Sequence, residues 1–99
     1  MNQAFKRTVY QIVKNALGQS LIEGKLKQWS VSLPIFQDLY FARRNEDKSL
    51  LEFVSIPQAT SELNTILEGL GNDSSLTIDD TTYRIGFGNK FIRFQELMN

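Results

Sequence analysis

Hydrophobic and polar residues alternate along this chain with two different periods, and the changes of period mark the expected elements. Near the N-terminus apolar residues recur at helical spacing, while Lys14 and Asn15 take the opposite face. The apolar positions are Phe5, Val9, Ile12, Val13, Ala16 and Leu17. This pattern predicts an amphipathic helix that Gly18 ends as a C′ residue. Two alternatives stay open: the helix continues past Gly18, or a short second helix restarts at Ser20.

A period of two follows in residues 27–34, where Trp29, Val31 and Leu33 alternate with polar residues. This alternation predicts a strand with one buried face, and Pro34 ends it or places it at an edge. Segments 36–44 and 48–56 are rich in aromatic and branched residues, and they flank a polar stretch, RNEDK. We expect these two segments to pair as antiparallel strands. Residues 35–40 would also fit one helical turn.

The second half of the chain predicts one helix and then a meander. Pro57 suits a first helical position, and a stripe of Leu and Ile residues at 63, 66, 67 and 70 runs up to Gly71, which stops the helix. Alternating strands follow at residues 75–79, 82–87 and 90–94, with turns at residues 79–82 and at Gly88-Asn89. The apolar positions after residue 90 also fit a helical spacing, so the last element is open between strand and helix.

Together these elements predict a single α+β domain over residues 1–99, with element order α-β-β-β-α-β-β-β and a last element that is strand or helix. A chain of 99 residues matches the size of one domain. The longest apolar runs are four residues, far short of the roughly 20 that span a bilayer. We therefore expect no membrane segment and a cytoplasmic location.

Composition removes several kinds of chemistry. The chain has no cysteine and no histidine, so it lacks thiolate ligands, disulfides and the commonest general base. Its 11 basic and 11 acidic residues cancel, yet residues 1–48 carry a surplus of four positive charges and residues 49–99 a surplus of four negative ones. Such asymmetry can steer a charged partner. We expect no catalytic residue, no cofactor and no metal.

The segment YRIGFGNKFIRF, residues 83–94, is the nearest approach to a chemical signature because it combines aromatic, basic and glycine residues. Its RIGFG and FIRF parts resemble two halves of the strand signature of RNA-recognition motifs, whose aromatics stack on bases. The segment departs from that signature by Ile85 after Arg84 and by the two residues that split the halves. The family also needs a helix and a further strand after this motif. No functional residue is therefore carried over from it.

Six residues stand out as candidate contacts with a partner. In the hairpin of residues 83–94, basic side chains beside aromatic ones could form a small platform for bases and phosphates. The lone Trp could anchor a protein partner, or it could fill the core. An Arg beside the RNEDK stretch completes the set. The candidates are Trp29, Arg43, Tyr83, Arg84, Lys90 and Arg93.

The function that this sequence favours is binding without catalysis. We expect a small protein-interaction module, a regulator, inhibitor or assembly factor that binds a larger protein, with homodimer formation through edge strands as an option. The alternative is a single-stranded nucleic-acid-binding protein that uses the hairpin of residues 83–94. Zero net charge counts against the alternative, because non-specific nucleic-acid binding draws mostly on phosphate neutralisation.

Overall fold

The computed structural model describes residues 3–18, 27–71, 73–78, 80–88 and 90–97. The first helix, α1 (Gln3–Gly18), is followed by strand β1 (Gln28–Ser32) and by two further helices, α2 (Leu33–Glu46) and α3 (Ile56–Leu70). The meander is built from β2 (Ser74–Ile78), β3 (Thr81–Phe87) and β4 (Phe91–Leu97). The α+β class is confirmed, and the order of elements is α-β-α-α-β-β-β.

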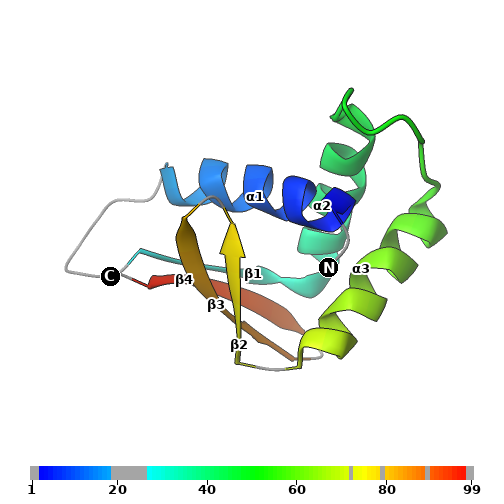
Figure 1. The fold of residues 1–99 in the computed structure, drawn as a ribbon. Helices are drawn as coiled ribbons and strands as arrows, with labels where there is room; N and C mark the ends of the chain where they lie inside the picture. The colour runs from blue at the N-terminus through cyan, green and yellow to red at the C-terminus, as the bar shows by residue number, and fades with distance from the viewer. Residues whose placement is uncertain (1–2, 19–26, 72, 79, 89, 98–99) are drawn as a thin grey trace.

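The four strands form one antiparallel sheet in the order β1-β4-β3-β2. The three helices lie on one side of this sheet, with α1 across it and α3 beside it (Figure 1). Because side chains alternate along a strand, one face of the sheet points to the helices. None of the described helices covers the other face, which we call the open face. Ile85 and Phe94 are paired in register on the helix-facing side and are fully buried.

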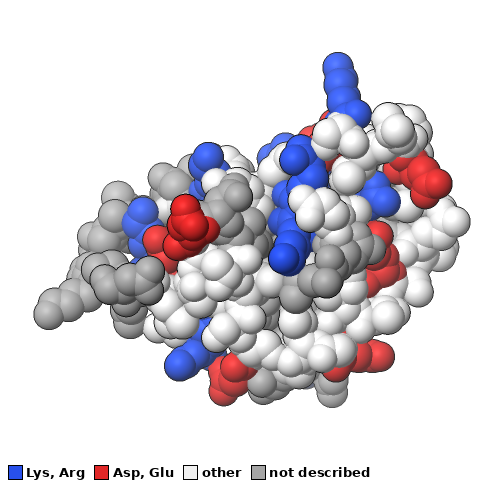
Figure 2. Space-filling view, viewed as in Figure 1, with Lys and Arg blue, Asp and Glu red and all other residues white. Residues whose placement is uncertain are grey.

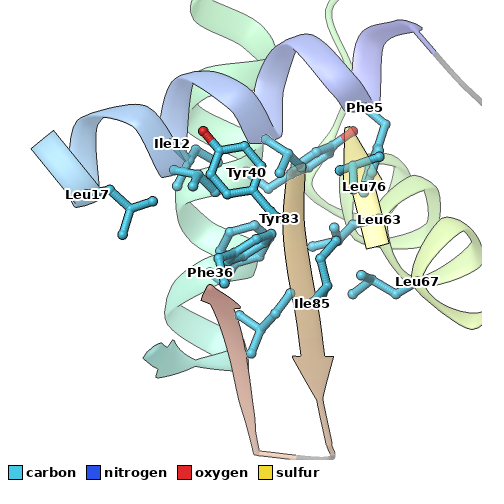
Figure 3. Close-up of a cluster of buried hydrophobic side chains, with 14 of the residues drawn as sticks. Phe5, Ile12, Leu17, Phe36, Tyr40, Leu63, Leu67, Leu76, Tyr83 and Ile85 are labelled. Carbon is cyan, nitrogen blue, oxygen red and sulfur yellow. The ribbon is translucent and has the colours of Figure 1, made fainter. Parts of the chain in front are cut away.

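The core lies between the helices and this face, and every element contributes to it (Figure 3). On α2 the ring of Phe36 packs against Phe94 of β4, with 5.5 Å between ring centroids. On α1 the ring of Phe5 packs against Tyr40, at 6.2 Å. The fully buried aromatic and branched side chains include Phe5, Val9, Val13, Phe36, Tyr40, Leu63, Ile85, Ile92 and Phe94.

The predicted strand pair at 36–44 and 48–56 is wrong. Residues 36–44 lie inside α2, and residues 47–55 belong to no helix or strand. Helix α2 begins at Leu33 because Ser32 caps it: the hydroxyl of Ser32 accepts from the backbone N–H of Ile35. Pro34 also fits the first turn of a helix. Phe36 and Tyr40 are one helical turn apart and face the core. Capping and burial thus override the local β preference of the aromatic residues.

The other predicted elements are confirmed with small changes of bounds. In α3 the capping box joins Ser55 and Gln58 through both of its hydrogen bonds, and Gly71 ends the helix with a φ of 75°. The last element is a strand and not a helix, because β4 has pairing partners on both sides, β1 and β3. The continuation of α1 past Gly18, the restart at Ser20 and the Asn89 half of the predicted turn lie outside the described residues.

Candidate protein interface

The most exposed of the large apolar side chains in the described residues lie just before and at the start of α3. Leu51 is 94% exposed, Phe53 is 83% exposed and Ile56 is 59% exposed. We call these three residues the apolar ridge. Single exposed apolar residues are ordinary on protein surfaces, but three of them fall within six positions here, and exposed apolar side chains that gather in one place can mark a binding site. The connecting segment 47–55 that carries the first two runs in the open between the ends of α2 and α3 (Figure 1).

A buried polar network fixes α3 and this segment to α2. Arg44 is only 6% exposed, and its Nε donates to Oε2 of Glu62 on α3 at 3.1 Å. The hydroxyl of Tyr40 donates to the same carboxylate oxygen at 2.6 Å. The pKa of Tyr40 is raised by burial and then by its bond to that carboxylate. Nη1 of Arg44 also donates to the backbone carbonyl of Glu52, at 3.1 Å.

The side chain of Asn45, the next residue of α2, holds the backbone of the segment. Its Nδ2 donates to the carbonyl of Val54 at 2.9 Å. The N–H of Val54 donates back to Oδ1 of Asn45 at 2.8 Å. One amide side chain thereby satisfies both backbone groups of Val54, as a neighbouring strand would do. Val54 itself packs against the core.

The start of the segment is tied to α1. Nε and Nη2 of Arg7 donate to the two carboxylate oxygens of Asp47, at 2.9 and 3.2 Å. The hydroxyl and the N–H of Ser49 donate to Oδ1 of the same residue. These bonds, the one from Arg7 first and those from Ser49 next, lower the pKa of Asp47 to about 2. The segment is therefore anchored at its beginning, middle and end.

Two of the predicted contact residues lie in or against the core. Tyr83 is 5% exposed and points to the helices, so its ring is not offered to a partner. Trp29 is half-buried, stacks on Phe94 with 6.2 Å between ring centroids, and packs at an angle against Phe36. Its ring therefore serves packing first.

Arg43 and Arg44 both lie on helix α2, and their side chains point in different directions. Arg43 points outward, with its side chain 40% exposed, and Nη1 forms an ion pair with Oε2 of Glu46 at 3.1 Å. Arg44 points inward to the buried network. In Figure 2 basic side chains lie mainly along the upper part of this face, over α1 and α2, while acidic side chains are spread over its left, lower and right parts.

Arg84 and Arg93 meet on the open face of the sheet. Arg84 is opposite Gln95, and Arg93 is opposite Gly86, so the two arginines are diagonal neighbours on adjacent strands. The guanidinium of Arg93 crosses over Gly86, where a Cβ atom would meet Nη2 at 2.9 Å, and reaches Asp73, with 3.9 Å between Nη2 and Oδ1.

Three further observations describe the same open face and its hairpin. Nε of Arg93 is buried without a hydrogen-bond partner in the described part of the chain. Phe91 lies on the same face, 47% exposed. Lys90 is exposed in the turn between β3 and β4. The structure therefore brings Arg84 and Arg93 together, while it sends Tyr83 to the opposite face.

A shallow pocket of about 420 Å³ lies between the start of α2, the C-terminal half of α3 and the β3–β4 hairpin. Its lining residues are Leu33, Asn64, Leu67, Glu68, Phe87 and Gly88. The lining combines apolar side chains with the amide of Asn64 and the carboxylate of Glu68, and a carboxylate does not suit a phosphate group. No group of three carboxylates is placed to hold a metal ion within the described ranges.

The sequence did not predict the apolar ridge, because residues 48–56 were expected to pair as an antiparallel strand with residues 36–44. One signal was present. Ser55, Pro57 and Gln58 form a helix start, so the apolar residues just before it have little room to enter a sheet.

None of the described helices is long and apolar enough to cross a membrane. Comparisons with protein-family models, with curated proteins and with solved structures found no match to this chain.

Proposed function

We propose that this protein is a non-catalytic interaction module, a regulator, inhibitor or assembly factor that binds a larger protein through the apolar ridge. One observation carries the proposal: Leu51 and Phe53 are almost fully exposed on a segment whose backbone is tied to α2. Leaving a Leu or Phe side chain in water forgoes about 1.5–3 kcal/mol of burial free energy each. A segment held in that arrangement is better explained by binding than by folding.

The network behind the ridge supports the same proposal. A buried Arg–Glu pair contributes little net stability, because desolvation offsets most of the attraction. Its effect here is geometric, since Arg44 joins Glu62 of α3 and the carbonyl of Glu52. A segment ordered before binding avoids the cost of ordering its side chains and backbone when the partner arrives. The ridge is therefore a preorganised surface.

Site-specific crosslinking in the native host tests this function. A photo-crosslinking phenylalanine analogue at Phe53 should capture one predominant protein. The matched control carries the same analogue at Thr77, which is exposed on the open face of the sheet. A partner captured from position 53 and not from position 77 supports the proposal. Equal capture from both positions, or none from position 53, contradicts it.

The open face favours a second candidate function, single-stranded nucleic-acid binding. Its specific observation is the pairing of Arg84 and Arg93 as diagonal neighbours beside the exposed ring of Phe91. Basic and aromatic side chains on an uncovered sheet can hold phosphates and stack on bases. This candidate ranks second because Asp73 lies beside one of the two arginines and the chain carries no net charge.

A salt titration of binding to a fluorescent single-stranded oligonucleotide tests this candidate. Affinity that falls steeply with salt, and that is lost in Arg84→Glu/Arg93→Glu, would support it. The matched control is Arg43→Glu/Lys48→Glu, which makes the same change of charge outside the open face. Binding that is absent at low salt, or equally weakened by both double variants, would remove the open face as a nucleic-acid site.

A further inference from the structure

The hydrogen bonds of the ridge segment alternate in a way that leaves one backbone edge free. The carbonyl of Glu52 and both backbone groups of Val54 bond to side chains of α2. The backbone groups of Leu51 and Phe53 have no hydrogen-bond partner within the described ranges. In an extended chain the N–H and C=O groups of one residue point to the same edge, and those of the next residue point to the opposite edge. The groups of Leu51 and Phe53 therefore lie on the edge away from α2.

Asn45 and Arg44 take the place that a neighbouring strand would hold on the inner edge. The segment is in effect a short strand with one edge satisfied by side chains and the other unpaired. An unpaired strand edge is a template for another chain. The side chains of Leu51 and Phe53 share one face of this strand and are exposed. Both the edge and the face are accessible at the same residues.

We propose that residues 51–53 bind an extended segment of the partner protein, which adds to the free edge as an antiparallel strand. This inference rests on the proposed function and names the partner's chemistry. Strand addition takes affinity from main-chain hydrogen bonds and specificity from alternate side chains. Partner residues opposite Leu51 and Phe53 are apolar. The residue between them lies opposite the exposed side chain of Glu52 and is basic.

Charge argues against a second copy of this chain as the occupant. In the register that pairs residues 51–53 of two copies with one another, Leu51 lies opposite Phe53 and Glu52 lies opposite the Glu52 of the other copy. That central pair is the non-hydrogen-bonded kind, with Cα atoms about 4.5 Å apart. Like charges directly opposite one another destabilise a strand pair. A Lys or Arg at the same position of a different protein reverses the sign of this contact.

The size of the ridge leads to the same choice. The three exposed side chains of the ridge on each of two copies would bury on the order of 800 Å² in total. Stable symmetric interfaces need about 1,200–2,000 Å² or more. The ridge alone is too small for a stable homodimer. A short extended segment with two apolar side chains matches its size, as in other strand-addition complexes.

Amide hydrogen exchange of the full chain, followed by NMR, tests this mode of binding. The probe is a blocked heptapeptide, Ser-Thr-Ile-Lys-Phe-Thr-Ser, at millimolar concentration. At saturation we expect severalfold slower exchange of the Leu51 and Phe53 amides. Exchange of the Val54 amide should not change, because Asn45 already holds it. The same peptide with an N-methyl group on its Phe should lose this effect, because it lacks one main-chain donor.

Reversing the charge of the central residue, in the peptide or in the protein, supplies the matched control. The heptapeptide with Glu in place of Lys should bind about fivefold more weakly, and the Glu52→Lys variant should reverse that preference. No slowing at Leu51 and Phe53, an effect that survives N-methylation, or a preference that Glu52→Lys leaves unchanged would overturn strand addition. If crosslinking from position 53 still captures a partner, the proposed function stands and only the mode of binding fails. If crosslinking also fails, both fall.

Discussion

Replacing Asn45 with alanine removes both hydrogen bonds that hold the ridge segment against α2. The two bonds join Asn45 to the carbonyl and to the N–H of Val54, at 2.9 and 2.8 Å, in a half-buried site. An intramolecular hydrogen bond contributes about 1 kcal/mol to the free energy of unfolding. The expected loss is therefore about 2 kcal/mol.

Urea denaturation of the Asn45→Ala variant measures this loss. With about 4–8 °C for each kcal/mol in a domain of this size, the melting temperature should fall by about 8–16 °C. The amide of Val54 should also exchange faster than in the unmodified chain. Asn45→Asp keeps the acceptor but replaces the donor with a charged oxygen facing a carbonyl, so it should lose at least as much stability.

Arg43→Ala is the matched control for these variants. It lies on the same helical turn and removes an exposed i,i+3 ion pair with Glu46, so the unfolding free energy should change by less than about 0.5 kcal/mol. If Asn45→Ala loses no more than this control, and the exchange of Val54 is unchanged, the segment is not held as described. The argument that the ridge is preorganised would then be refuted.

Three further perturbations test other parts of the structure. Arg44→Met removes the ion pair from the partly buried carboxylate of Glu62, so the unfolding free energy should fall by about 3 kcal/mol. A second change, Glu62→Leu, removes that carboxylate but also the acceptor of the Tyr40 hydroxyl, so it should restore only part of the loss in a denaturation cycle; additive losses would contradict the pairing. The pKa of Asp47 is lowered from 3.8 to about 2, so the stability that its carboxylate contributes is present above pH 3.8 and lost as pH falls toward 2. Denaturation measured against pH should show the Asp47→Asn variant less stable at pH 7 and less sensitive to acid. Parallel stability curves of the variant and the unmodified chain would refute this. Gly86→Ala brings a Cβ to 2.9 Å from Arg93 Nη2, the end of a flexible side chain that can move, so stability should change by less than about 1 kcal/mol, and a larger loss would mean that the guanidinium is fixed.

The parts of the fold that sequence predicted are those where one local signal decides. In α3, the capping box at Ser55 and Gln58 agrees with the apolar stripe that follows. In the meander, Leu76 and Tyr83 alternate with polar neighbours, and they pair across β2 and β3 on the buried face. Period and turn chemistry point to the same answer at these places.

The middle of the chain could not be read in this way, because local preference and tertiary contacts disagree there. Leu39 and Phe41 place apolar residues on other sides of α2, so its buried stripe is not evident from the sequence. Arg44 completes that stripe, although a charged residue is expected to face the solvent. The buried role of Arg44 depends on Glu62, which is far away in sequence. Such long-range pairs leave no periodic signal.

The candidate contact residues could also not be placed from the sequence alone. The sequence pointed to residues 83–94, and strand alternation then divided them, placing Tyr83 in the core and Arg84 and Arg93 on the open face. The exposure of Phe53 follows from the path of a connecting segment. That path is set by hydrogen bonds to side chains of α2 and by the ion pair between Asp47 and Arg7 of α1, all of them contacts that no local pattern predicts.

The most direct test of the central claim is the Leu51→Ser/Phe53→Ser variant, measured for both stability and partner capture. Both side chains are almost fully exposed, so the account predicts an unfolding free energy within about 0.5 kcal/mol of the unmodified chain. It also predicts loss of the protein that crosslinks from position 53, assayed by retention on immobilised variant. A loss of several kcal/mol would place these residues in the folding core, and unchanged retention would remove the ridge as the binding surface.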